Sequence, residues 1–218
     1  MDCRPGAFLT IFEGEKEFDL LDLQNGRADL LADVEVPVGT YTQMRLVVTQ
    51  GTVELKDGRP PFVLTVPSGE QSGIKLQFTF TIEEGAETTL LLDVDLSRAF
   101  RPVPAGRIED PDTIRQFKFQ PAFAMRLVNL LEAGSVSGAV TDEAGAPLAD
   151  ASVTAFDADE EVTSTSTEDD GTYVLAGLPA GEYRLEFSAA SYQDAEVEGV
   201  EVTVGEETPS GEVALAAE

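Results

Sequence analysis

Apolar side chains recur at every second position along most of this chain, and this spacing constrains the fold more than any other feature of the sequence. Over residues 74–82 the apolar positions alternate with lysine, glutamine and threonine. A period of two places one set of side chains on each face of an extended strand, so such segments are expected to form antiparallel strands with one buried face. Further strands of this kind are expected over residues 44–48, 53–55, 88–96 and 117–127.

Two interruptions of the pattern are informative. Pro121 falls inside the last of these runs and is expected to mark a sheet edge or a bulge, because proline cannot donate to a strand ladder. The best helix candidate, residues 20–31, is interrupted by Asn25-Gly26, a dipeptide typical of turns. Helix is therefore expected to be a minor component of the fold.

The last third of the chain consists of short apolar runs separated by Gly, Pro and Asp. Short strands at this spacing are typical of a small β-sandwich, here of about seven strands. The whole chain is therefore predicted to be all-β, with two β-sandwich-like domains. In the second of them, strands are expected at residues 135–141, 151–156, 162–167, 172–175, 181–188, 193–197, 200–204 and 212–215.

Charge is distributed unevenly along the chain. Of the 41 acidic and 14 basic residues, residues 134–218 hold 20 acidic residues and a single basic one, Arg184. Such a shift in composition predicts a domain boundary near Gly134, which gives a β-rich domain at residues 1–133 and a second domain at residues 134–218. The 20 carboxylates must lie on a small surface, because carboxylates are almost never buried without a partner.

Composition also excludes several classes of function. The chain has no His, which rules out Ser-His-Asp and Cys-His catalysis and imidazole-bound zinc, and Cys3 alone cannot form a disulfide or a thiolate cage. A formal net charge of −27 makes nucleic acid or an anionic membrane an unexpected partner. No apolar run reaches the roughly 18 residues of a membrane span, and residues 1–6 lack the features of a signal peptide. No catalytic residue and no cofactor are predicted.

Two acidic clusters are the candidates for a metal site. Asp157, Asp159 and Glu160 form one, and Asp169 and Asp170 belong to the other. Carboxylate oxygens suit Ca²⁺, but neither cluster has the ligand spacing of an EF-hand loop. Both clusters fall where hairpin loops are expected, so the alternative interpretation is two solvated acidic loops.

The tyrosines allow two interpretations. Tyr41 and Tyr183 each follow a Pro-x-Gly turn, in residues 36–41 and 178–183, where the ring can pack at the end of a sandwich with its hydroxyl bonded to nearby backbone. Tyr173 is likewise expected in a core or corner role. Tyr192, beside Ser191 and Gln193, is expected to be exposed and is the candidate ligand-binding residue, because sugars stack on exposed aromatic rings. Asp93 and Asp95 are expected on the polar outer face of a strand.

Residues 135–215 resemble the carboxypeptidase regulatory-like family. The resemblance rests on residues 136–142, 145–148, 151–153 and 171–183, which include Gly-Thr-Tyr-Val-Leu-Ala-Gly-Leu-Pro-Ala-Gly-Glu-Tyr. It implies a transthyretin- or immunoglobulin-like sandwich with a carbohydrate-binding-like fold, used as a spacer, docking or carbohydrate-binding-like module.

Residues 18–131 resemble the domain of unknown function 4382 family, which is common in bacterial and archaeal lipoproteins. The matching stretches are residues 18–23, 30–32, 38–41 with 45–46, and 119–124. The resemblance implies an extracytoplasmic location, at the cell surface or in the periplasm. Domains of that family usually open with additional strands, and no similar segment is recognised here, which points either to a misassigned gene start or to an abbreviated domain. An open sheet edge is therefore expected near the N-terminus. Self-association would cover that edge, or residues 7–12 would substitute for the missing strand.

These observations lead to three functional hypotheses. The preferred one is a non-enzymatic, lipoprotein-like surface or envelope protein whose C-terminal module is a spacer or docking unit for an unknown protein or polysaccharide. The alternatives are a carbohydrate-binding module protein and an unrecognised hydrolase that uses carboxylates alone. The excess of acidic residues, together with ten Arg against four Lys, further predicts a halophilic, high-salt setting.

Overall fold

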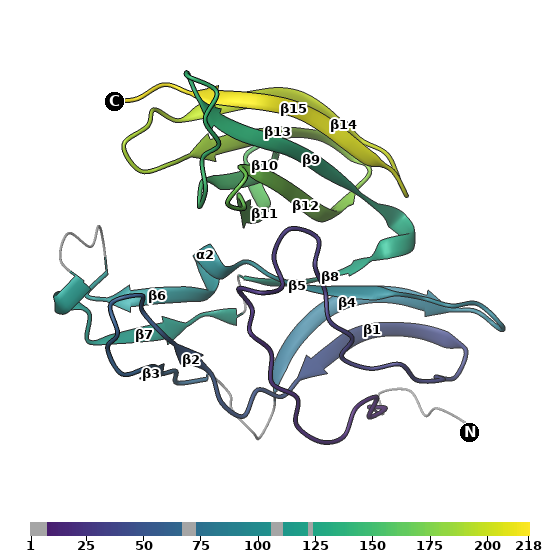
Figure 1. Ribbon diagram of the computed structural model, residues 1–218. Coiled ribbons are helices and arrows are strands. Elements are labelled where there is room, and N and C mark those ends of the chain that lie inside the picture. The colour runs from purple at the N-terminus through teal and green to yellow at the C-terminus, as the bar shows by residue number, and fades with distance from the viewer. Residues whose placement is uncertain (1–7, 67–72, 106–110, 122–123) are drawn as a thin grey trace. The chain divides into compact units, whose positions relative to one another are not determined.

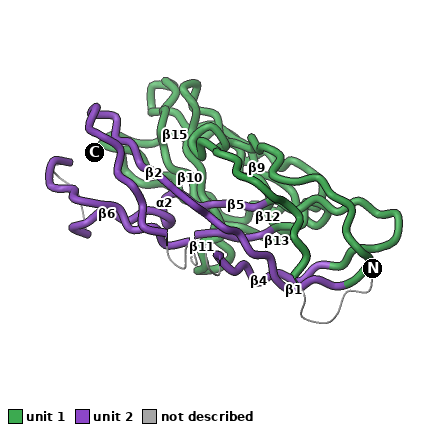
Figure 2. Tube along the Cα trace, turned by 90° about the horizontal axis from the view of Figure 1, so that it is seen from below, with its two compact units in different colours: residues 1–39, 81–91, 128–218 green, residues 40–80, 92–127 purple. Residues whose placement is uncertain are grey.

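The computed structural model describes residues 8–66, 73–105, 111–121 and 124–218 (Figure 1). The fold is all-β, as predicted, with about 50% of residues in strands and 6% in helices. The described parts of the chain form two compact units, one from residues 1–39, 81–91 and 128–218 and the other from residues 40–80 and 92–127 (Figure 2). The predicted boundary between residues 133 and 134 stays a prediction.

Residues 133–218 form a sandwich of seven strands, which agrees with the predicted sandwich of about seven, although eight strand segments were expected. The strands are β9 (Ala133–Asp142), β10 (Ser152–Asp157), β11 (Glu160–Ser166), β12 (Thr172–Pro179), β13 (Gly181–Ser188), β14 (Ala195–Val202) and β15 (Glu207–Leu215). One sheet has the order β11-β10-β13-β14 and the other the order β12-β9-β15. All pairs are antiparallel except β15 with β9, which is parallel.

The alternating pattern of β13 explains how this sandwich buries its core. Tyr183, Leu185 and Phe187 are buried, while Arg184 between the first two is half-buried and Glu186 between the last two is exposed. The other strands contribute in the same way to a core of fourteen buried residues. All 20 carboxylates of residues 134–218 lie outside that core, as the cost of burying charge requires.

One prediction for the sandwich is wrong. Residues 193–197 and 200–204 were expected as two strands but belong to one, β14. Tyr183 pairs with Val200 and Leu185 pairs with Val197, so Glu198 and Gly199 together face a single residue of β13. The chain accommodates this bulge at Gly199, whose φ of +71° glycine adopts without a steric penalty.

The second unit has a smaller core, and its strands lie within residues 39–132, a range that also includes residues of the first unit. The elements of residues 39–132 are β1 (Gly39–Leu46), β2 (Thr52–Val53), β3 (Phe62–Val63), β4 (Ile74–Ile82), β5 (Leu90–Val94), α2 (Leu96–Ala99), β6 (Phe100–Val103), η1 (Pro111–Thr113), β7 (Gln116–Phe119), β8 (Met125–Asn129) and η3 (Leu130–Glu132). The strands pair as β1-β4, β2-β3, β5-β8 and β6-β7. The core of the unit comprises Leu64, Ile74, Leu76, Ala99, Phe119, Ala124 and Leu127.

The single strand expected over residues 117–127 is also wrong. It is divided into β7 and β8, which pair with different partners, β6 and β5. The division falls at Pro121, where an edge or bulge was expected, and the run includes Phe123, which lies outside the described residues. A proline removes one ladder donor, so the chain leaves one sheet and enters another at this point.

The N-terminal segment forms a turn where one was predicted. Asn25 and Gly26 have φ angles of +55° and +73°, and the described residues 8–38 contain no helix. Residues 8–12 form no strand, so the prediction that residues 7–12 would add a strand to the sheet edge is not met over these residues, and Ala7 lies outside the described residues. β1 pairs with β4, and no third strand joins this sheet among the residues that the structure describes. Self-association through that edge stays a prediction.

Among the described helices, none has the length and the apolar character that crossing a membrane requires.

Candidate functional site

The first acidic cluster lies on a hairpin turn, as predicted. Asp157 ends β10, Glu160 begins β11, and the two residues pair across the turn. Ala158 has a φ of +51°, which closes the connection tightly, and Asp157, Asp159 and Glu160 are all exposed. Exposed carboxylates on a turn of this kind keep their hydration.

The second acidic cluster lies in the loop between β11 and β12. Asp170 Oδ1 accepts hydrogen bonds from Thr172 N at 3.0 Å and from Thr172 Oγ1 at 2.6 Å. These bonds to the charged form hold the pKa of Asp170 below its ordinary value. Glu160 begins β11 and the second cluster follows the end of that strand at Ser166, about 20 Å away at strand spacing, so the structure does not bring the clusters together. No group of three or more metal-ligand side chains gathers in the described ranges.

Folding is therefore expected to be independent of a metal ion. Chelator treatment of the purified chain should leave its melting temperature unchanged, because isolated oxygen ligands bind Ca²⁺ weakly. Thermal unfolding with and without EDTA, at matched ionic strength, measures this. A melting temperature lowered by more than about 5 °C corresponds to a loss of roughly 1 kcal/mol in the free energy of unfolding of a small domain. Such a shift would contradict the expectation and would favour a Ca²⁺ site at these loops.

Tyr192 was predicted to be exposed, and this prediction is wrong. Its side chain is half-buried and packs against the core of the sandwich. The reason lies in the last residues of the chain, which were not expected to pair with this loop. Gln193 N donates to Ala216 O at 2.8 Å and Glu218 N donates to Ser191 O at 3.1 Å, and this pairing encloses the tyrosine between them. A sugar-stacking role for Tyr192 stays an untested prediction.

The other tyrosines have the structural roles that were predicted. Tyr183 Oη donates to the carbonyl oxygen of Pro179 at 2.9 Å, which is the expected bond between a corner tyrosine and nearby backbone. Tyr41 stacks on Phe80, with 5.4 Å between ring centroids. Tyr173 is 1% exposed and packs edge-on against Phe187 at 5.8 Å.

The Tyr173 hydroxyl lies 2.5 Å from Ser210 Oγ, and burial raises the pKa of this tyrosine above its ordinary value of 10.0. A raised pKa in the folded state means that the unfolded chain ionises first as pH rises. The contribution of Tyr173 to stability is therefore complete below pH 10 and is lost at higher pH.

Tyr173→Phe is expected to flatten this alkaline loss of stability. At neutral pH the variant should lose only about 1 kcal/mol, the value of one hydrogen bond. Urea unfolding at neutral pH and above pH 10 measures both effects. An unchanged alkaline slope in the variant would contradict the assignment of that slope to Tyr173.

The prediction of a polar outer face is wrong for Asp95, whereas Asp93 lies between Leu92 and Val94, which pack on the core, and so faces the other side of the strand. Asp95 is 6% exposed and caps α2, where its Oδ1 accepts from Ser97 N at 2.9 Å and from Arg98 N at 3.3 Å. Asp93 Oδ2 forms an ion pair with Arg126 Nε at 2.8 Å. A strand that ends in a helix needs a capping residue, and that requirement determines the position of Asp95.

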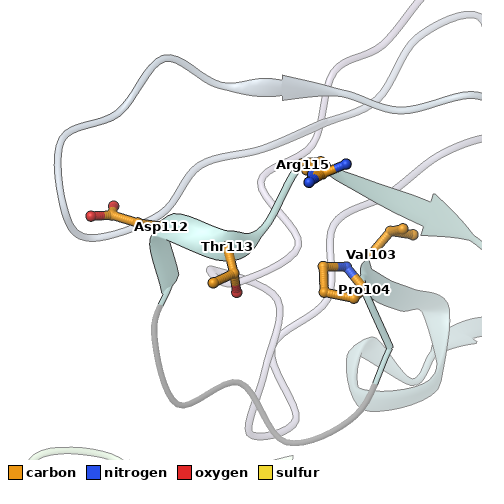
Figure 3. A pocket seen from close by; sticks show the side chains of 5 residues that line it. All are labelled: Val103, Pro104, Asp112, Thr113 and Arg115. Atoms are coloured by element: carbon orange, nitrogen blue, oxygen red, sulfur yellow. The ribbon is translucent and has the colours of Figure 1, made fainter.

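One cavity, of about 440 Å³, lies beside β6 and β7 (Figure 3). It is lined by Val103, Pro104, Asp112, Thr113 and Arg115, and the Val103–Pro104 peptide bond is cis. Figure 3 shows Asp112 directed away from Val103 and Pro104, in agreement with an exposed fraction of 86% for its side chain. The polar side chains of the lining do not point toward a common centre. The cavity therefore has an apolar wall, formed by Val103 and Pro104, and the guanidinium of Arg115 lies nearby.

A second hollow, of about 330 Å³, lies on the outer face of the four-stranded sheet; we call it the outer-sheet hollow. Its lining consists of Thr154, Glu186, Ser188 and Glu196, which face away from the core, together with Asp194 just before β14 and the core-facing residues Phe187 and Ala195. Hydroxyls and carboxylates at a fixed strand spacing provide hydrogen-bond acceptors on a rigid support.

Arg184 organises the carboxylates beside this hollow. Its guanidinium bonds to Glu186, lies 3.4 Å from Glu196 Oε2, and lies over the ring of Phe156 at 4.4 Å. The hydrogen bond to Glu186 raises the pKa of Arg184, which remains protonated. The sequence analysis did not identify this site, although Arg184 is the single basic residue of residues 134–218 and was therefore a visible signal.

Two family profiles match the chain. The family described as "Domain of unknown function (DUF4382)" matches residues 5–120, and the carboxypeptidase regulatory-like domain matches residues 135–216. Both resemblances drawn from the sequence are thereby confirmed. Among curated proteins, no significant match was found.

Several solved structures are similar to the chain at low identity. A type II cohesin–X–dockerin complex from Acetivibrio cellulolyticus is 22% identical over 38% of this chain and 58% of its own, with a TM-score of 0.32. The minor pilin GBS52 of Streptococcus agalactiae is 12% identical over 84% of both chains, with a TM-score of 0.31. The TIE protein of Bacillus anthracis is 15% identical over 83% of this chain and 34% of its own, with a TM-score of 0.32. This chain spans between 41% and 61% of the length of the first structures that it matches.

Proposed function

We propose that this chain, which belongs to the family of the domain of unknown function DUF4382, is a non-enzymatic structural and interaction protein of the cell surface or envelope. Its C-terminal sandwich would act as the spacer or docking module. The match of residues 135–216 to the carboxypeptidase regulatory-like domain supports that role for the sandwich. The lipoprotein-like character remains a proposal from family resemblance, and Cys3 lies outside the described residues.

The observation that carries the proposal is the construction of the outer-sheet hollow. A rigid four-stranded sheet holds Glu186 and Glu196 in place through one arginine, and it presents them beside Thr154 and Ser188. A shallow surface of fixed polar groups suits the recognition of another surface, whereas small-molecule sites are deep and mainly apolar. The docking partner would contribute hydroxyls or cations to these carboxylates.

The acidity of the sandwich supports a particular setting for this function. Its 20 carboxylates repel one another, and the repulsion weakens as salt shortens the screening length. A chain of this composition would be most stable in a salt-rich exterior. The halophilic character is therefore part of the proposal.

Labelling of intact cells tests the location. A reagent that reacts with amines and cannot cross membranes should label this chain on intact cells of its source as fully as it does after lysis. Labelling of the chain that appears only after lysis, with a known surface protein labelled in both samples, would contradict the proposal.

A glycan array tests the carbohydrate-binding alternative on the full chain. Binding of a glycan that is lost in the double variant Glu186→Gln, Glu196→Gln would favour that alternative and would place the ligand at the outer-sheet hollow. Asp159→Asn is the matched control, because it removes an exposed carboxylate from a turn that does not line the hollow.

A further inference from the structure

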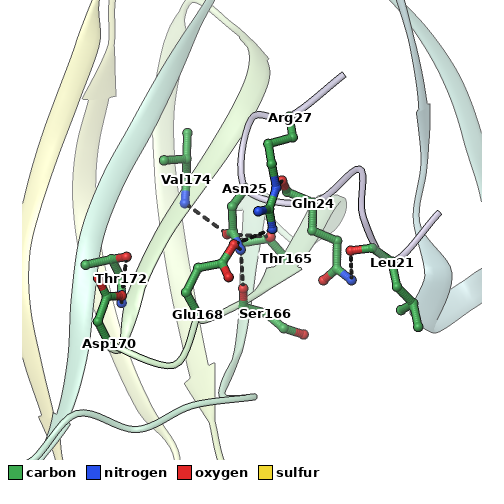
Figure 4. A network of polar contacts seen from close by, with 10 residues as sticks. All are labelled: Leu21, Gln24, Asn25, Arg27, Thr165, Ser166, Glu168, Asp170, Thr172 and Val174. Carbon is green, nitrogen blue, oxygen red and sulfur yellow. Dashed lines mark hydrogen bonds and ion pairs between the residues drawn. The ribbon is translucent and has the colours of Figure 1, made fainter. Parts of the chain in front are cut away.

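A turn from the N-terminal segment lies against the open edge of the C-terminal sandwich (Figure 4). β11 is the edge strand of the four-stranded sheet, and β12 is the edge strand of the three-stranded sheet. Edge strands present backbone donors and acceptors that require partners. In Figure 4 the side chain of Asn25 points between Ser166 of β11 and Val174 of β12 and meets both strands.

The carboxamide of Asn25 uses its full hydrogen-bonding capacity at this place. Its Nδ2 donates to Ser166 O at 2.9 Å and to Glu168 Oε1 at 2.9 Å. Its Oδ1 accepts from Thr165 Oγ1 at 3.0 Å and from Val174 N at 3.2 Å. A carboxamide has two donor hydrogens and two acceptor lone pairs, so all four are satisfied here. The side chain replaces a peptide group, with one backbone bond to each edge strand.

The residues next to Asn25 complete the fit. Gly26 approaches β12 closely, because an added Cβ would lie 3.2 Å from Val174 Cγ1, and its φ of +73° also favours glycine. Arg27 forms an ion pair with Glu168 at 2.6 Å, so Glu168 binds both Asn25 and Arg27. Arg27 Nε also donates to Gln24 O at 3.3 Å, which stabilises the turn itself.

We propose that the gap between β11 and β12 is a binding site for an Asn-Gly turn, and that residues 24–27 of the same chain are its resident ligand. Residue 25 belongs to the part that matches one family and residues 165–174 to the part that matches the other. The first module thus supplies the edge contact of the second, and the two modules are energetically coupled. Each family match covers only one of the two modules, whereas the contact of Asn25 with β11 and β12 connects the two modules.

Amide hydrogen exchange of the full chain tests the site directly. In Asn25→Ala the Val174 amide loses its acceptor and should exchange about tenfold faster, the factor expected for one hydrogen bond of ordinary strength. The Val140 amide, which donates to Gly171 O at 2.8 Å, should keep its rate and reports that the sandwich remains folded. An unchanged Val174 rate in Asn25→Ala would overturn the proposal.

Asn129→Ala is the matched control. Asn129 also bonds to backbone in a short turn, where its Oδ1 accepts from Leu131 N at 3.1 Å, and its Nδ2 donates to Glu132 within the same turn rather than to β11 or β12. This variant should leave the Val174 rate unchanged. An equal acceleration of Val174 in Asn129→Ala would show a general loss of stability and would count against a dedicated site.

A measurement on the unmodified chain covers the case in which Asn25→Ala does not fold. The side-chain amide protons of Asn25 should exchange several-fold more slowly than those of Asn129, which donates to an exposed glutamate. Equal rates would overturn the proposal. The protection should also be the same at high and low protein concentration, because a dependence on concentration would mean that a second copy supplies the turn.

Discussion

Gly134→Ala is expected to lower the free energy of unfolding of the chain by about 3 kcal/mol or more, because the new methyl group has no space. Gly134 lies in β9, and a Cβ at this position would overlap the carbonyl oxygen of Thr203 and lie 2.8 Å from that of Glu206. Both neighbours are backbone atoms of the connection between β14 and β15, and the added methyl group would have to displace that connection. The same segment is fixed by the bonds from Ser135 N to Glu206 O and from Gly205 N to Ala133 O.

Gly181→Ala is the control for this prediction. Gly181 is also a strand glycine of the sandwich without a positive φ, and the nearest atom to its added Cβ is 3.6 Å away, in the Tyr183 ring. It should therefore be tolerated within about 0.5 kcal/mol. Urea unfolding of the two variants and the parent measures the difference. Equal losses in both variants would contradict the argument from backbone overlap.

Phe187→Ala is expected to lower the free energy of unfolding by about 3–5 kcal/mol, the range for a large aromatic removed from a full core. Phe187 is fully buried in β13, between the two sheets, and packs against Tyr173. The cavity left by the ring would be lined by side chains from both sheets, which the strand ladders prevent from closing in. The melting temperature should fall accordingly.

Phe156→Ala provides the comparison on the opposite face of the same sheet. Phe156 pairs with Arg184 and is half-buried beneath its guanidinium. Its removal should cost less than half as much as that of Phe187, because the site is open to solvent and leaves no closed cavity. A loss as large as that of Phe187→Ala would mean that the outer face of this sheet is part of a core.

The sequence predicted the positions of strands well where one face of a strand is buried and the other face is exposed to water. β4 and β13 occupy the predicted residues 74–82 and 181–188, because their apolar side chains alternate without interruption. The period of two determines which face is buried but gives no information about neighbours in a sheet. The parallel pairing of β15 with β9 was therefore beyond prediction.

The errors come from places where one residue changes the local geometry. Gly199 allows a bulge inside β14, and the sequence pattern of a bulge is the same as that of a turn between two strands. The helix cap formed by Asp95 depends on a helix of four residues, which is too short to show a period of 3.6. Both features are decided by tertiary packing.

The contact of Asn25 with the sandwich shows a further limit of sequence analysis. The Asn-Gly dipeptide predicted a turn, and the turn is present. Its partners Ser166 and Val174 are 141 and 149 residues away, and no local pattern connects them. The outer-sheet hollow was missed for a related reason, since its residues come from three strands.

Thermal unfolding of the full chain in NaCl tests the proposal that the acidic sandwich is most stable in a salt-rich exterior. Between about 0.01 and 1 M salt the screening length falls from about 30 Å to about 3 Å, so repulsion among the 20 carboxylates of residues 134–218 becomes confined to immediate neighbours. Sucrose, which strengthens apolar burial without screening charge, is the control. The melting temperature should rise steeply over this range in NaCl, far more than in sucrose. A melting temperature that stays the same from about 0.01 to 2 M NaCl would contradict the proposal.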